Sequence, residues 1–209
     1  LSLLPSILNE SVFTPSSTIT LHGCVTDKVL SSLCSGIGKL KKIVFDEVRI
    51  TSSPSYFTSM IKNLKVESIS FLGCKFDDAQ ILSDNFFEIN KQLIDITIGT
   101  NDGTWQSFPL LTDRTLDRWA TSGRQPPCIQ FHNIDTSFTI QGVQRLIRSF
   151  ISIASPYDRF CCKLGRINSS MDNVINQLSR LPGLKVHRVH TTFLYAISHN
   201  PRIELNLQT

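Results

Sequence analysis

Short runs of alternating apolar and polar residues recur along the whole chain. Each run has the form apolar-x-apolar-x-x-apolar, with cysteine or asparagine at the last position in some copies. Such alternation directs the apolar side chains to one face of a β-strand and the polar ones to the other. We therefore predict about eight strands, spaced 19 to 33 residues apart and starting at Ile19, Ile43, Ile69, Ile96, Ile129, Cys162, Leu184 and Ile203.

Segments in which apolar residues repeat at helical spacing separate most of these runs. After Thr26, for example, Val29, Leu30, Leu33 and Ile37 follow one another at that spacing. Hydroxyl and acidic residues stand just ahead of these segments, where the first N–H groups of a helix need acceptors. We interpret four aspartates at such places as helix caps and not as paired acid/base carboxylates: Asp27, Asp77, Asp78 and Asp113.

The order strand, turn, helix at this period resembles the leucine-rich-repeat family. The copies that end at Asn101 and Cys74 follow its L-x-x-L-x-L-x-x-N/C pattern, with isoleucine and phenylalanine in place of leucine. The resemblance covers about residues 16 to 208. It implies an α/β solenoid, or horseshoe, with a parallel sheet on the concave face and helices on the convex face. We expect a single irregular domain over residues 1–209, belonging to a longer chain because Leu1 is no natural start.

Two adjacent stretches resemble the F-box-associated repeat domains of nematodes. Residues 111–119 read LTDRTLDRW, and residues 123–131 form a turn rich in glycine and proline that leads into a short apolar strand. The resemblance implies substrate capture for a ubiquitin ligase. The part that binds the ligase adaptor is expected before Leu1, because residues 1–8 are too short for an F-box.

A doubly wound α/β domain, which could carry an enzyme, also alternates strands with helices. Its strands are covered on both faces and read as nearly continuous apolar runs. Here polar residues interleave with the apolar ones, as Ser68 and Ser70 do in the third run and Asp95 and Thr97 in the fourth. This interleaving favours the solenoid.

Motifs of known catalytic, metal or cofactor sites are missing from the sequence. It has no phosphate-binding or dinucleotide-binding glycine loop, no H-E-x-x-H, no G-x-S-x-G and no C-x-x-C. His187 and His190 form an H-x-x-H, but their odd spacing on a strand directs the two rings to opposite faces. Cys24 and Cys74 occupy the repeat position whose side chain bonds the backbone of the turn. We predict no enzyme, no metal and no cofactor.

Composition adds little to this picture. The 209 residues include 21 Lys+Arg against 17 Asp+Glu, and no apolar run approaches the length of about 18 residues that spans a membrane. Six cysteines in a chain of this length are expected to be free thiols of an intracellular, cytoplasmic or nuclear protein. The cations between Lys163 and Arg188 leave a second function open, an RNA-associated adaptor or scaffold.

We predict a non-catalytic module that binds another protein on the concave face, where solenoids usually bind. Trp105 and Phe108 are expected on a loop, where they could anchor the partner or fold onto the edge of the core. Asn206 is a further polar position of the concave face. The main predicted residues of this face are His22, Asp46, Leu72, Gln130, His132, Lys163, Lys185 and His187.

Overall fold

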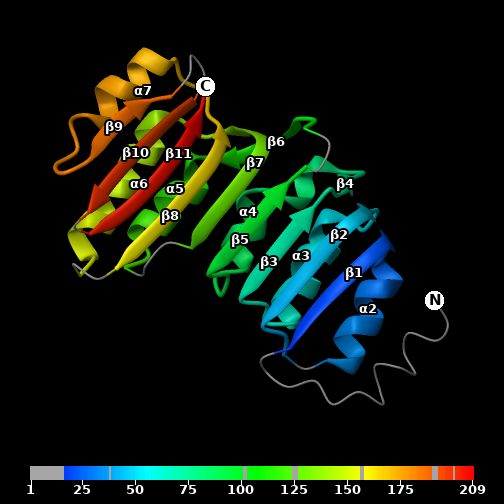
Figure 1. The fold of residues 1–209 in the computed structure, drawn as a ribbon. Helices are drawn as coiled ribbons and strands as arrows, with labels where there is room; N and C mark the ends of the chain where they lie inside the picture. The colour runs from blue at the N-terminus through cyan, green and yellow to red at the C-terminus, as the bar shows by residue number, and fades with distance from the viewer. Residues whose placement is uncertain are drawn as a thin grey trace. The chain divides into compact units, whose positions relative to one another are not determined.

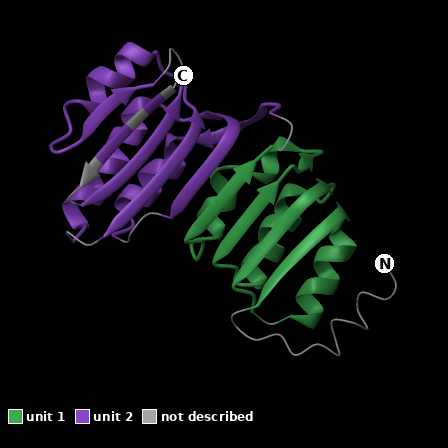
Figure 2. Ribbon diagram, in the orientation of Figure 1, with its two compact units in different colours: residues 1–102 green, residues 103–209 purple. Residues whose placement is uncertain are grey.

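The chain forms two compact units, Leu1–Asp102 (unit 1) and Gly103–Thr209 (unit 2), as Figure 2 shows. Both combine strands with helices, so the fold class is α/β. The prediction of one domain over residues 1–209 stays a prediction. Asn101, His190, residues 1–8 and residues 124–126 lie outside the described residues. The computed structural model describes residues 17–37, 39–100, 103–123, 127–155, 158–189, 193–199 and 201–209.

Unit 1 contains parallel strands in chain order (Figure 1). The strands are β1 (Thr18–Val25), β2 (Lys42–Ile50), β3 (Ser68–Leu72) and β5 (Asp95–Gly99), with the short β4 (Lys75–Phe76) paired to β2. They contain the described residues of the first four predicted runs except Cys74, which lies between β3 and β4. The connections hold α2 (Asp27–Gly36), α3 (Pro54–Asn63), the 3-10 helix η1 (Ala79–Ile81) and α4 (Asp84–Ile89).

Unit 2 starts with the same arrangement. Strands β6 (Gln106–Thr112), β7 (Cys128–Ser137) and β8 (Arg159–Arg166) are parallel and in chain order. Helices α5 (Asp113–Thr121), α6 (Ile140–Ile153) and α7 (Met171–Leu178) follow them in turn. Strand β6 was not predicted, because residues 106–109 were assigned to a loop and Thr112 to the start of the next helix.

The C-terminal strands do not follow the predicted order. Strand β11 (Arg202–Gln208) pairs with β8, next to it lies β10 (Phe193–His199), and β9 (Lys185–Arg188) is outermost. The prediction that the runs from Leu184 and Ile203 follow in chain order as seventh and eighth strands is therefore wrong, although β11 does pair parallel with β8. The physical reason is the length of the connections, four residues and two residues, because a parallel pair needs a crossover of about a dozen residues or more.

The core of each unit lies between its strands and a layer of helices on one face of them (Figure 1). In unit 1 the rings of Phe45 and Phe71 stack at 5.0 Å, and Phe57 of α3 lies 5.7 Å from Phe45. In unit 2 the rings of Phe150 and Phe160 lie 5.1 Å apart. These rings are buried against the helices. The strands therefore have one apolar, buried face and one more polar face, as the alternation predicts.

A residue with positive φ recurs four positions after the start of four runs: Gly23, Glu47, Gly73 and Asn133. In β7 the register against β8 shifts at this point, between Phe131 and Asp135. One extra residue in a strand reverses the alternation, so an apolar residue at odd spacing can still point into the core. This explains why the last apolar residues of three runs are buried, namely Val48, Cys74 and Ile134.

Candidate functional site

Five predicted binding residues lie on one surface of unit 2: Gln130, His132, Lys163, Lys185 and His187. We call this surface the open face, because the helices of the unit lie on the other side of the strands (Figure 1). Pairing in register places Gln130 of β7, Lys163 of β8 and Asn206 of β11 in one row across the strands. The row continues through β10 to His187 of β9.

The other three predicted residues lie in unit 1. Asp46 of β2 is in register with Leu72 of β3. On the neighbouring strand β1, the Nδ1 atom of His22 lies 3.7 Å from the Oδ2 atom of Asp46. Both side chains are exposed, so this contact provides little stabilisation.

A hollow of about 270 Å³ opens on the open face between β7, β8 and β11. It lies where these strands are irregular, since Asn133 and Gly165 have φ values of 57° and 67° and the register shifts between Asn206 and Gln208. A Cβ atom at Gly165 would collide with the carbonyl oxygen of Ile134, so only glycine allows β8 to approach β7 this closely. The lining residues are Phe131, His132, Asn133, Lys163, Gly165, Asn206, Leu207 and Gln208.

The hollow is electropositive, and its polar side chains include one pure donor, Lys163, beside amides that can both donate and accept. Lys163 makes no ion pair with any described residue, and none of the lining residues is acidic. Burial lowers the pKa of His132, and the positive charge of Lys163 lowers it further. His132 is therefore neutral at pH 7, and Lys163 supplies the one positive charge of the lining.

Trp105 lies at the edge of the same surface. It is 38% exposed, and the guanidinium carbon of Arg166 stands 4.0 Å from the centroid of its ring. Arg166 forms an ion pair with Asp135 at 3.4 Å and is in register with Gln208, which lines the hollow. Trp105 thus lies against Arg166, whose register partner Gln208 lines the hollow together with His132 and Lys163.

Phe108 does not lie on a loop, and that part of the prediction is wrong. It belongs to β6, is in register with Thr136 of β7, and is 1% exposed. Pairing with β7 turns the side chain into the core, because an apolar ring is more stable there than in water. Of the two predicted anchors, only Trp105 is accessible to a partner.

The sequence did not indicate five of the lining residues as part of a binding site: Phe131, Asn133, Gly165, Leu207 and Gln208. Asn133 and Gly165 carry a signal that could have found them. Asparagine and glycine inside a strand often mark a bulge, since both tolerate positive φ. Gln208 carries no such signal. It follows the truncated run of Ile203 and Leu205, where no further alternation shows which face of the strand it occupies.

Burial disfavours the reactive thiolate form of two cysteines, Cys74 and Cys162. All six are free thiols, and burial raises the pKa of Cys74 to about 11 and that of Cys162 well above its usual value. Cys74 Sγ donates to the carbonyl oxygen of Phe45 at 3.2 Å, as predicted for this repeat position. The same prediction is wrong for Cys24, which is exposed because the register places it beside the exposed Arg49.

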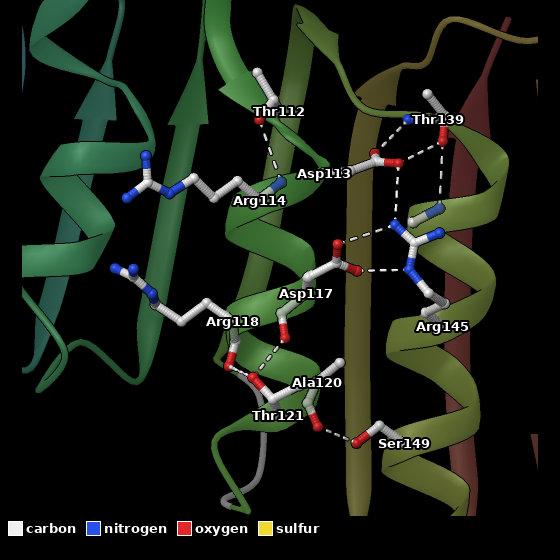
Figure 3. A network of polar contacts seen from close by, with 11 residues as sticks. Thr112, Asp113, Arg114, Asp117, Arg118, Ala120, Thr121, Thr139, Arg145 and Ser149 are labelled. Atoms are coloured by element: carbon white, nitrogen blue, oxygen red, sulfur yellow. Dashed lines mark hydrogen bonds and ion pairs between the residues drawn. The ribbon is translucent and has the colours of Figure 1, made fainter.

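The helix layer of unit 2 holds a polar network with a structural role (Figure 3). Thr112 caps α5 by accepting from the backbone N–H of Arg114 at 3.2 Å. Asp113 instead accepts from the N–H and the hydroxyl of Thr139 at the start of α6, at 2.7 and 2.5 Å. Our interpretation of Asp113 as a cap of its own helix is therefore wrong, because Thr112 already occupies the capping position.

Of the other three aspartates, one is a helix cap and two bond to residues of a neighbouring repeat. Asp78 caps η1 by accepting from the N–H of Gln80, which confirms its interpretation. Asp27 accepts from Ser52 of the next repeat at 2.5 Å, and Asp77 pairs with Arg49 at 2.8 Å. Two residues thus link successive repeats where we expected caps.

Among the described residues, no three His, Cys, Asp or Glu side chains come together as a metal site. Within the same part of the chain, none of the helices combines the length and the apolar character that crossing a membrane requires. Comparison of the chain with models of protein families, with curated proteins and with solved structures finds no match.

Proposed function

We propose that this chain is a non-catalytic protein-recognition module that binds its partner on the open face of unit 2. The observation that carries the proposal is the hollow of about 270 Å³, which opens on a helix-free strand surface next to the accessible Trp105. Strand surfaces left uncovered by helices are the usual binding surfaces of repeat proteins. Exposed tryptophans are frequent anchors of protein interfaces.

We also propose that the repeats form a leucine-rich-repeat-like solenoid. In support of this, the parallel strands of unit 1 follow chain order, and so do β6, β7 and β8 of unit 2. Strands β9 to β11 depart from that order, and they would then cap the last repeat. Terminal repeats of solenoids are commonly atypical, since they have no neighbour on one side.

Ion pairs favour a protein partner over RNA. On unit 2, Arg166 pairs with Asp135, Arg188 with Asp172 and Arg202 with Glu204, at 3.4, 3.8 and 2.5 Å. Binding of RNA would need several unpaired cations along one surface to replace the counterions of the phosphates. Because F-box-associated repeats capture substrates, an intracellular substrate of a ubiquitin ligase is the first class of partner to test.

Site-specific photo-crosslinking tests this proposal. A photoreactive amino acid at Gln130 on the open face should crosslink to a defined protein in cells. The same amino acid at the exposed Gln141 of α6, in the helix layer, is the matched control. Protein crosslinks specific to the Gln130 position support the proposal. Equal crosslinks from both positions would contradict it, and so would crosslinks to RNA that disappear as salt is raised.

A further inference from the structure

The hollow of unit 2 offers donors that lack acceptors. The ammonium of Lys163 and the side-chain amides of Asn206 and Gln208 have no hydrogen-bond or ion-pair partner among the described residues. These groups come from two adjacent strands, β8 and β11, that pair in register. A lysine ammonium can only donate, so a partner that fills this hollow must bring an acceptor to it.

The charge and the size of the hollow narrow the choice of acceptor. One lysine beside a neutral histidine matches a single negative charge, as on a carboxylate. The lining comes entirely from strands, so no helix N-terminus supports the second charge of a phosphate. The volume of about 270 Å³ is at the lower end of the roughly 300 to 1,000 Å³ of pockets that enclose a whole small molecule, and the hollow is open to solvent. A hollow of this size fits one side chain.

We propose that the hollow binds the carboxylate of an aspartate or glutamate side chain in an extended segment of the partner protein. This inference rests on the proposed function and deepens it. Lys163 supplies the charge, Asn206 and Gln208 donate hydrogen bonds, and Trp105 contacts the residues that flank the acid. The ion pair of Arg166 with Asp135 holds Arg166 against the Trp105 ring, so the anchor is ordered before binding.

A bound carboxylate would also act on His132, which lines the same hollow. Of its neighbours, β8 presents Lys163, β11 presents amides that do not titrate, and β6 carries no charged residue. A negative charge stabilises the imidazolium, so binding should raise the pKa of His132. By linkage, affinity should then increase as pH falls through that pKa.

NMR of the full chain with small probes tests the inference directly. The probe is N-acetyl-glutamate N-methylamide, which presents a side-chain carboxylate in a peptide-like frame. We expect saturable shifts of the Asn206 and Gln208 amide signals and a rise of roughly 0.5 to 1 unit in the pKa of His132. The uncharged N-acetyl-glutamine N-methylamide should bind at least about tenfold more weakly, because it leaves Lys163 unpaired.

Variants and competing anions complete the test. Lys163→Met should abolish the shifts, whereas Lys62→Met, a matched change on the helix layer of unit 1, should leave them intact. Equal binding of the glutamine probe would overturn the inference. So would tighter binding of inorganic phosphate, or of N-acetyl-glycine, which carries only a terminal carboxylate.

If the probes fail while Gln130 still crosslinks to a protein, only the chemistry of the hollow is overturned. Probe binding without such crosslinks would instead contradict the proposed function.

Discussion

At the scale of single residues, positive φ explains how the repeat pattern becomes a binding surface. The sequence shows an apolar residue at odd spacing in several runs, but it does not show how the backbone adapts to it. The structure places Glu47 and Asn133 in the left-handed region, with Gly23 and Gly73 at the equivalent positions of their runs. The same irregularity at Asn133 and Gly165 forms the hollow. Strand positions were therefore predictable, whereas the hollow depends on backbone geometry that alternation does not encode.

The first prediction compares alanine substitutions at two glycines. It separates the cost of a left-handed backbone from the cost of a steric clash with a neighbouring strand. Gly165 and Gly123 have nearly equal φ values of 67° and 65°, but only Gly165 faces a backbone atom. Gly123→Ala should lower the free energy of unfolding by about 1 kcal/mol, from left-handed strain alone. Gly165→Ala should cost more than about 2 kcal/mol, because the carbonyl of Ile134 must also move. Urea unfolding of both variants measures the difference, and equal losses would show that β8 and β7 can separate freely.

At the scale of elements, helices were more predictable than the strands at the C-terminus. Hydroxyl residues mark helix starts, and Thr26, Thr112, Thr139 and Ser170 all cap as such residues should. Strand β10 reads FLYAISH, in which neighbouring positions are both apolar, so no alternation reveals it. Its direction follows from its two short connections. Connection length is thus a signal that a search for repeats alone does not use.

The second prediction compares two aspartates of α5 (Figure 3). Asp113 is 23% exposed and accepts two hydrogen bonds from Thr139 besides a longer one from Arg145 at 3.4 Å, whereas Asp117 is 45% exposed and bonds Arg145 alone among these residues. Asp113→Ala should lower the free energy of unfolding by about 1 to 2 kcal/mol, because the start of α6 loses its acceptor. Asp117→Ala should cost less than about 1 kcal/mol.

Salt provides the control for this comparison. At 1 M NaCl the cost of Asp117→Ala should vanish, since screening removes an exposed ion pair. The cost of Asp113→Ala should largely persist, because one of its bonds is to a backbone N–H. Equal costs that both vanish with salt would mean that Asp113 acts only through its charge.

At the scale of the whole molecule, the repeats are found in both units, although we expected a single domain from the sequence. Periods of 24 to 27 residues separate the first four runs, and a longer period of 33 residues, from Ile96 to Ile129, spans the boundary at residue 102. That lengthening comes partly from β6, part of which we expected to be a loop. A change of period is therefore a better indication of a boundary than the composition of the linker.

The third prediction concerns the independence of the units. The phenylalanines of unit 1 contact one another, as Phe57 contacts Phe86 at 6.1 Å, and unit 2 has its own cluster around Phe150. Fragments 1–102 and 103–209 should therefore each unfold cooperatively in urea. Each should have an m-value about half that of the full chain, because m scales with the surface exposed on unfolding. If neither fragment folds while the full chain unfolds in one transition, stability depends on the stacking of all repeats. That result would support the single solenoid domain, in which no repeat can bury its apolar face alone.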